Sequence, residues 1–188
     1  MARIEIRLTG SGGQGIITAG HILGHATSLY TEMEAIMTRG YGPEIQGGWA
    51  RADVVIDNEE IEFPYLTQPD YLIALSQNEF ERDRDSLKED GIILASDLVN
   101  LNPEDPHKSY SIPVVRIAEE ELGRKVMANI VMLGAFTGII GIVPMEAMER
   151  AVEMNVPKGT GDLNLKAFRR GYEYAKELFD PALGAGQV

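Results

Sequence analysis

Apolar and polar residues change their spacing along the chain in ways that predict strands and helices in turn. Arg3 to Thr9 alternates charged and apolar residues, as a strand with one buried face does. A run of glycines follows, and apolar residues from Ile16 to Tyr30 then recur at helical spacing. The chain is therefore predicted to begin with a strand, a glycine loop and a helix.

Short apolar runs predict five further strands, at residues 35–38, 51–57, 71–75, 91–96 and 114–117. The last two runs have no polar face, which is typical of strands buried in a parallel sheet. Too few residues separate 35–38 from 51–57 to hold a crossover helix. We expect these two strands either to pair antiparallel or to leave the intervening glycine-rich loop for another purpose.

Residues 78–88, 145–154 and 165–179 have the pattern of helices. Pro144 suits the first turn of the second of these helices. The third is predicted to stop at Asp180 and Pro181. Its apolar residues fall on one stripe, made of Leu165, Phe168, Tyr172, Ala175 and Phe179.

A further helix, Met127 to Ile140, is apolar on every side, so we expect it to lie buried within the fold or under a partner. Gly134 and Gly138 leave it a smooth face for the close approach of another helix. Asn129 needs hydrogen-bond partners if it is buried, and we expect these from loop backbone rather than from a cofactor.

The chain has 188 residues, the size of one domain, with 44% hydrophobic and 24% charged residues, as in ordinary soluble proteins. We predict a single domain over residues 1–181 and a flexible tail over 182–188. No apolar run reaches the roughly 18 residues that a membrane span needs, and the N-terminus has no signal-peptide pattern. We therefore expect a cytoplasmic protein that does not contact membranes.

Charge and cysteine content restrict the chemistry further. A formal net charge of −12 with no cluster of Lys and Arg argues against binding to nucleic acid. The sequence has no cysteine, and so neither a disulfide nor a thiolate site for an iron–sulfur cluster is expected. His21 and His25 lie one helical turn apart, a spacing that can chelate zinc. Without a third ligand nearby, we favour two helix-surface histidines and predict no metal site.

The first glycine loop matches the pattern G-x-G-x-x-G between a strand and a helix. In this position free backbone N–H groups and the helix N-terminus attract phosphate. The alternative is a tight turn whose glycines need positive φ. The candidate cofactor-binding residues are Gly10, Ser11, Gly12, Gly13, Gln14 and Gly15.

A dinucleotide site of the Rossmann type would need an acidic residue at the end of the second strand. That strand ends instead in Thr38 and Arg39, while Glu32 and Glu34 lie at its other end. Arg39 suits a 2′-phosphate, which keeps NADP as an alternative, but the second crossover helix of a Rossmann half is missing.

The second glycine loop, residues 38–51, mixes two arginines, an acid and two aromatics with glycines. Arg39 and Arg51 are natural anchors for a carboxylate or diphosphate, because a guanidinium pairs with either in a bidentate manner. The alternative is an internal salt bridge to Glu44 or Asp53. Further candidate site residues are Tyr41 and Glu44, and Trp49 and Tyr41 equally suit an interface.

Neither a catalytic triad nor a pair of carboxylates in a plausible cleft can be recognised, so no catalytic residue is predicted in this chain. With both loops considered, the chain resembles the gamma subunits, or the fused gamma domain, of the pyruvate/2-oxoacid:ferredoxin oxidoreductase family. The matching segments stand in the family's order: GSGGQG at 10–15, YGPEIQGGW at 41–49, RADVV at 51–55, PDYLIALSQ at 69–77 and NIVMLGA at 129–135. The likeness runs from Ile4 to about Tyr174.

The resemblance implies an α/β fold, a three-layer Rossmann-like sandwich with a mostly parallel sheet flanked by helices. It also implies a complex that decarboxylates a 2-oxoacid on thiamine diphosphate, passes electrons through iron–sulfur clusters to ferredoxin and forms an acyl-CoA. The partners would be alpha and beta subunits, and a delta subunit where the complex has one, which would carry the clusters and most thiamine contacts. Gly10–Gly15 and the loop from Arg39 to Arg51 would line the cofactor or CoA entrance.

The resemblance implies 2-oxoglutarate as the substrate. Three segments carry this part of the resemblance: the YGPE form of the second glycine loop, Phe63–Tyr65 and the closing segment LKAFRRGY. Two other classes of function stay open from the residues themselves. One is a stand-alone NADP-dependent oxidoreductase, and the other is a binding module for CoA or another phosphorylated metabolite.

Overall fold

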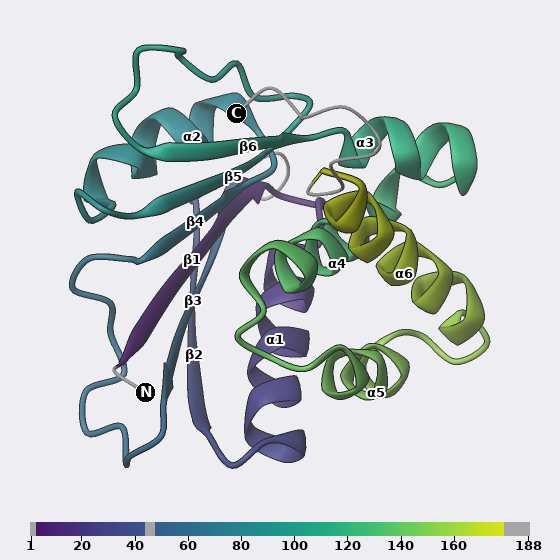
Figure 1. The fold of residues 1–188 in the computed structure, drawn as a ribbon, viewed down its shortest axis with the longest axis horizontal. Helices are drawn as coiled ribbons and strands as arrows, with labels where there is room; N and C mark the ends of the chain where they lie inside the picture. Colours follow the sequence, from purple (N-terminus) through teal and green to yellow (C-terminus); the bar gives the residue numbers. More distant parts are fainter. Residues whose placement is uncertain (1–2, 44–47, 179–188) are drawn as a thin grey trace.

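The computed structural model describes residues 3–43 and 48–178 as one sheet with helices on both faces (Figure 1). The strands lie in the order β2-β3-β1-β4-β5-β6. β1, β4, β5 and β6 are parallel neighbours, whereas β3 runs antiparallel to both β1 and β2. The strands are β1 (Ile4–Ser11), β2 (Glu34–Tyr41), β3 (Trp49–Asp57), β4 (Tyr71–Ala74), β5 (Ile92–Ser96) and β6 (Lys108–Ile112).

The helices are divided unequally between the two faces of the sheet. α1, α4, α5 and α6 form a thick layer on one face, and α2 lies on the other (Figure 1). Three short turns of other helix types complete the described chain: η1 (Arg84–Ser86), η2 (Ile117–Glu121) and η3 (Lys125–Met127). The α-helices are α1 (Ile16–Tyr30), α2 (Gln77–Asp83), α3 (Val114–Arg116), α4 (Ala128–Ile140), α5 (Met145–Asn155) and α6 (Gly161–Leu178).

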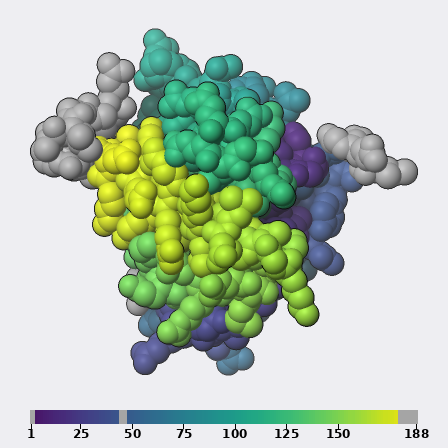
Figure 2. Space-filling model, turned by 90° about the vertical axis from the view of Figure 1, so that its right-hand side faces the viewer, coloured from purple at the N-terminus to yellow at the C-terminus, as the bar shows by residue number. Residues whose placement is uncertain are grey.

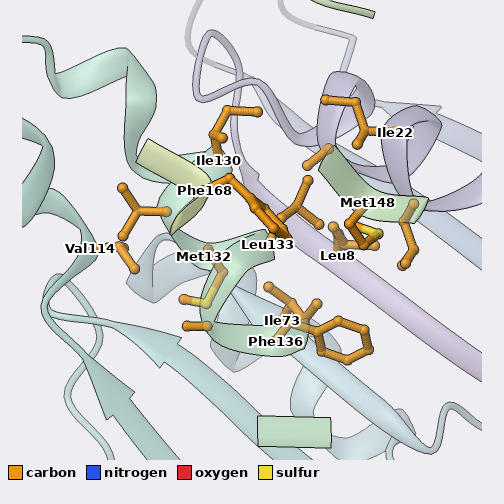
Figure 3. Packing of buried hydrophobic residues seen from close by; sticks show 14 of the residues in the cluster. Leu8, Ile22, Ile73, Val114, Ile130, Met132, Leu133, Phe136, Met148 and Phe168 are labelled. Carbon is orange, nitrogen blue, oxygen red and sulfur yellow. The ribbon is translucent and has the colours of Figure 1, made fainter. Parts of the chain in front are cut away.

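Alternating side chains of the strands separate two cores. Ile73 and Leu94 face the thick helical layer, together with Leu8 of β1. Their sequence neighbours face α2, where Phe80 covers a smaller cluster containing Leu72, Ala74, Ile93 and Ala95. In the larger core, Phe136 and Phe168 are 1% and 0% exposed, and Figure 3 shows them among side chains from the sheet and from α1 and α5.

Most predicted elements are confirmed, and the antiparallel alternative for the two early strands is the one observed. Met37 of β2 lies opposite Val54 of β3. The helix at 127–140 is buried within the fold, since all its residues from Ala128 to Thr137 are buried. The predicted stop at Asp180 and Pro181 and the predicted tail at 182–188 lie outside the described residues.

The strand predicted at Val114–Ile117 is wrong. This segment forms α3 and the start of η2, and the strand lies just before it, at Lys108–Ile112. The Asp97 carboxylate accepts hydrogen bonds from the N–H groups of Val115 and Arg116, at 2.9 and 3.0 Å, and so starts a helix after Pro113. A short buried apolar run has the same sequence pattern in a strand and in a helix.

The predicted close approach to α4 is confirmed, and the second helix is α6. A Cβ added at Gly134 would collide with the carbonyl oxygen of Phe168, and one at Gly171 would collide with that of Val131. The backbones of the two helices are therefore in direct contact. Contacts this close need glycine on both sides of the interface.

Candidate functional site

The ends of β1 and β4 diverge toward opposite faces of the sheet. β1 continues into α1, which lies in the thick helical layer, whereas its parallel neighbour β4 continues into α2 on the other face (Figure 1). In open α/β sheets, a crevice forms where adjacent strands diverge in this way, at their carboxyl ends. The first glycine loop lies at this point, so the topology independently marks it as a candidate site.

A pocket of about 260 Å³ opens at this point. Its walls come from the loop after β1, the end of β4, α3, η3 and the start of α4, and they are mainly apolar. Lys125 contributes a cationic side chain, which is 62% exposed and lies 3.5 Å from the Glu119 carboxylate. The lining residues are Gly13, Gln14, Leu75, Val115, Lys125, Val126 and Ala128.

The glycines of the first loop are required for two different reasons. Gly13 and Gly15 have φ of 90° and 75°, which L side chains rarely adopt. A Cβ at Gly10 would lie 2.6 Å from Oε1 of Gln14, and one at Gly15 would collide with the Asn129 side chain. The tight-turn interpretation therefore accounts for part of the motif. Gly13 differs from Gly10 and Gly15, because a Cβ built there would meet no atom within 4 Å.

Several polar groups of this loop are bonded within the protein. The N–H of Ser11 donates to Oε1 of Gln14 at 2.7 Å, and Nε2 of Gln14 donates to the Leu75 carbonyl at 3.2 Å. The N–H of Gly12 donates to the carbonyl oxygen of Gly48 at 2.5 Å. The Gln14 amide thus ties β1 to β4, and the bond from Gly12 joins the two glycine loops.

Ser11 also connects the loop to α2. Its hydroxyl lies 3.3 Å from the hydroxyl of Ser76 and 3.4 Å from the carboxylate of Glu79, and Ser76 itself donates to Glu79. Glu79 is 7% exposed. Sequence reasoning missed it, although Glu79 and Asp83 lie one turn apart on the side of α2 that faces β1.

The structure places Arg39 and Arg51 on opposite faces of the sheet. Arg39 lies opposite Ala52, which is buried under α1, whereas Arg51 lies opposite Gly40 on the other face. The two arginines therefore do not converge on one anion. Arg39 is exposed, as is Tyr41, and Glu44 lies outside the described residues.

Arg51 belongs to a buried charge network. Its guanidinium lies 3.5 Å from Asp53, which confirms one of the two predicted internal salt bridges, and 3.6 Å from Asp83. Arg82 stacks on the Trp49 ring, with its guanidinium carbon 4.4 Å from the ring centre. Trp49 is therefore packed against Arg82 of α2, within this chain.

Arg7 and Asp53 form the most enclosed pair of this network. Two guanidinium nitrogens of Arg7 donate to the two carboxylate oxygens of Asp53, at 2.8 and 3.0 Å. Burial acts to lower the pKa of Arg7, but the hydrogen bonds and charge of Asp53 outweigh it and leave the pKa raised. Both residues occupy polar positions of predicted strands, yet their pairing depends on a strand register that the sequence does not reveal.

Asp83 is the second buried acid of the network. Burial acts to raise its pKa, but hydrogen bonds from Arg82 at 2.7 Å and Thr9 at 2.6 Å outweigh burial, and the net shift is downward. The carboxylate is thus held ionised, with its oxygens already bonded. It serves to stabilise the end of β1 and is poorly suited to accept a proton.

Asn129 has the backbone partner that the sequence predicted. Its Nδ2 donates to the carbonyl oxygen of Gly15 at 3.0 Å, and its Oδ1 accepts from the N–H of Ile130 at 2.9 Å. His21 and His25 are in contact, with ring centres 4.0 Å apart. Within residues 3–43 and 48–178, no three His, Cys, Asp or Glu side chains are grouped to hold a metal ion.

A larger hollow of about 390 Å³ lies on the outer helical face, between η2 and α6, and has a different character. Figure 2 shows this face, with α6 in yellow beside the teal segment that contains α3. Charged side chains line the hollow and pair with one another, as Arg170 does with Glu121 at 2.8 Å. None of its lining residues belongs to either glycine loop.

A family model for pyruvate ferredoxin/flavodoxin oxidoreductase matches residues 5–174. The chain belongs to this family, which defines it as a component of an oxidoreductase complex. No helix in the described part of the chain is long and apolar enough to cross a membrane.

Curated relatives and solved structures agree on the type of component. The 2-oxoglutarate synthase subunit KorC of Methanocaldococcus jannaschii is 51% identical over 94% of this chain and 96% of the relative. The pyruvate synthase subunit PorC of Methanothermobacter marburgensis is 34% identical over 92% of this chain and 98% of the relative. A crystal structure of a keto/oxoacid ferredoxin oxidoreductase gamma subunit from Geobacter sulfurreducens matches with a TM-score of 0.84 and 38% identity, over 94% of this chain and 98% of that one.

The chain is thus a gamma subunit of a 2-oxoacid:ferredoxin oxidoreductase, and it resembles the KorC subunit more than the PorC subunit. A 2-oxoglutarate:ferredoxin oxidoreductase from Magnetococcus marinus shares the fold, with a TM-score of 0.83 at 23% identity. The match covers 94% of this chain and 31% of that longer one.

Proposed function

We propose that this chain is the gamma subunit of a thiamine-diphosphate-dependent 2-oxoglutarate:ferredoxin oxidoreductase, and that the pocket between β1 and β4 faces CoA. The complex would convert 2-oxoglutarate and CoA to succinyl-CoA and CO2, and the electrons released would reduce ferredoxin. The proposed substrate is supported by the 51% identity to a 2-oxoglutarate synthase subunit.

One observation carries the proposed site. The predicted glycine loop lies at the point where β1 and β4 diverge, beside a pocket with apolar walls and a lysine at its edge. CoA combines an apolar pantetheine arm with phosphates, and these residues fit such a molecule. Val115, Val126 and Leu75 would contact its arm, while Lys125 and the backbone N–H of Gly13 would attract a phosphate.

The role of this chain in the reaction would be to bind and orient. Thiamine diphosphate supplies the decarboxylation chemistry when it is bound in the complex, and we assign its contacts mainly to the alpha and beta subunits. The absence of cysteine supports placing the iron–sulfur clusters on partner chains. The candidate site residues Gly10–Gly15 would line the cofactor entrance, and Tyr41 and Arg51 would flank it from opposite faces of the sheet.

The alternative of a stand-alone NADP enzyme has less support. In a dinucleotide site, the backbone at the second glycine of the motif approaches the pyrophosphate. Here the N–H of Gly12 is bonded to Gly48, and Arg39 extends on the α1 side of the sheet. A binding module for CoA alone would share the pocket and differ in having no catalytic partners.

The test is co-expression of this chain with the other subunits of its complex, followed by a CoA-dependent viologen-reduction assay with a panel of 2-oxoacids. We expect an active, cluster-containing complex that prefers 2-oxoglutarate. Preference for pyruvate would contradict the proposed substrate and keep the family assignment. A colourless chain that purifies alone and binds NADPH tightly would contradict the proposed function itself.

A further inference from the structure

Two aromatic rings stand exposed on the chain that joins β3 to β4. Phe63 and Tyr65 are 53% and 60% exposed, and their rings pack edge to face with centres 5.6 Å apart. A monomeric protein has no need to hold two large rings together in water. Aromatic side chains in this setting are characteristic of binding hot spots.

The backbone that carries these rings is fixed by hydrogen bonds. Arg3 donates from Nη1 to the carbonyl oxygen of Phe63 at 2.8 Å and from Nη2 to that of Tyr65 at 2.9 Å. Its Nε donates to the Glu5 carboxylate, also at 2.8 Å. One guanidinium therefore fixes the backbone beneath both rings.

Glu5 anchors the same segment from within the protein. Its carboxylate is 3% exposed and accepts hydrogen bonds from the N–H groups of Thr67 and Gln68, at 2.8 and 3.0 Å. Burial acts to raise the pKa of Glu5, but the bonds from Arg3, Thr67 and Gln68 outweigh it, so the carboxylate stays ionised. Because the segment is ordered in advance, little conformational entropy remains to be lost when a partner binds.

The chain segment that carries the rings is acidic. Between residues 57 and 70 the sequence has no lysine or arginine. Its exposed acids on the approach to Phe63 are Glu59, Glu60 and Glu62. A matching surface must therefore combine an apolar pocket with a rim of lysines or arginines.

We propose that Phe63 and Tyr65 form an aromatic docking knob that inserts into another subunit of the oxidoreductase complex, in an apolar pocket with a basic rim. A second copy of this chain is a poor occupant, because it would bring two acidic rims together at a net charge of −12 per chain. The proposal rests on the chain being a subunit and does not depend on the assignment of the pocket near Gly13.

The docking knob and the glycine loop lie at opposite ends of β1. Arg3, which holds the knob, directly precedes the strand, and Ser11 ends it. Eight residues of strand span roughly 25 Å. Changes at the knob are therefore expected to alter assembly without reaching the cofactor entrance.

The test measures binding of this chain to the purified remaining subunits of its complex. Replacing both rings (Phe63→Ala with Tyr65→Ala) should weaken binding by at least about 10-fold, as loss of a hot spot does. Leu29→Ala is the matched control, because Leu29 is 55% exposed on α1 and lies outside the knob. It should change binding less than about 2-fold. Thermal unfolding of each isolated variant checks that the fold is intact.

A charge-reversal variant tests the rim separately. Changing Glu59, Glu60 and Glu62 to lysine should weaken binding at low salt and reverse the salt dependence that the unaltered chain shows, because added salt then screens a repulsion instead of an attraction. Unchanged binding of the double alanine variant would overturn the proposal. Self-association of the isolated chain that the same variant abolishes would also overturn it, in favour of a second copy as the occupant.

Discussion

Asn129 and Gly15 are 114 residues apart in sequence and are joined by a 3.0 Å hydrogen bond from a side-chain amide to a backbone carbonyl. The bond connects the start of α4 to the end of the first glycine loop. Gly15 has no room for a Cβ because Asn129 occupies that space. The loop is thus held from the helical layer as well as from the sheet.

Replacing Asn129 by leucine should remove this bond and leave the Gly15 carbonyl without its partner. We expect the free energy of unfolding to fall by about 1–3 kcal/mol, measured by urea denaturation of the isolated chain. Asn155→Leu is the control, since Asn155 bonds to the Ala151 carbonyl within its own helix, at 2.8 Å. An equal loss in both variants would show that the bond to Gly15 has no special importance.

Gly13→Val should abolish activity of the assembled complex while the domain stays folded. The valine would meet open space but would add bulk beside the pocket and strain at φ 90°. Gly159→Val is the control. Gly159 has a similar φ of 85° and no atom within 4 Å of an added Cβ, but it lies between α5 and α6. Viologen reduction should therefore be lost in the first variant and kept in the second. Equal activities would contradict the proposed site.

Gly134→Ala should destabilise the protein by about 3 kcal/mol, because the added Cβ meets the backbone of α6, and no change of side-chain rotamer can relieve that clash. Gly161→Ala is the control, as a Cβ there has nothing within 4 Å. The two melting temperatures should differ clearly, and a small effect of Gly134→Ala would mean that α4 and α6 can separate at little cost.

Acid should weaken the protein partly through Asp105. Burial acts to raise its pKa, but hydrogen bonds from Arg84 and His107 outweigh it and lower the pKa from 3.8 to about 2. A carboxyl group whose pKa is lowered by folding stabilises the fold at pH values above its pKa in the unfolded chain. This contribution is lost as the pH falls from about 4 to about 2.

The expected contribution of Asp105 above pH 4 is about 2 kcal/mol, and its side chain is 4% exposed. The difference in unfolding free energy between the unaltered chain and Asp105→Asn should therefore shrink as the pH falls from about 4 to about 2. Asp85→Asn serves as the control, since the Asp85 side chain is 90% exposed. A difference that stays constant from pH 5 to pH 2 would contradict this assignment.

Local patterns in the sequence predicted much of the fold. The helix at Ile16–Tyr30 has the bounds that its apolar spacing gives, and the positive φ of Gly13 and Gly15 follows from the strand-to-helix turn. The backbone partner of Asn129 could be expected because a buried amide in an apolar helix must be bonded. These features depend on residues close in sequence or on a single general constraint.

Features that depend on strand register and remote partners could not be predicted. The Val114–Ile117 segment is helical because Asp97, far back in the chain, bonds its amides. Arg39 and Arg51 diverge because the register of β2 against β3 sends them to opposite faces. The buried pair of Arg7 and Asp53 depends on the register of β1 against β3.

The contact between α4 and α6 also determines how the molecule responds to force. At Gly134 and Gly171 backbone rests on backbone, with no side chains between that could absorb a displacement by changing rotamer. Asn129 continues this stiff connection from α4 to Gly15. We therefore expect a displacement of α6 to be passed on through the backbone of α4 and the Asn129 side chain to the loop that borders the pocket.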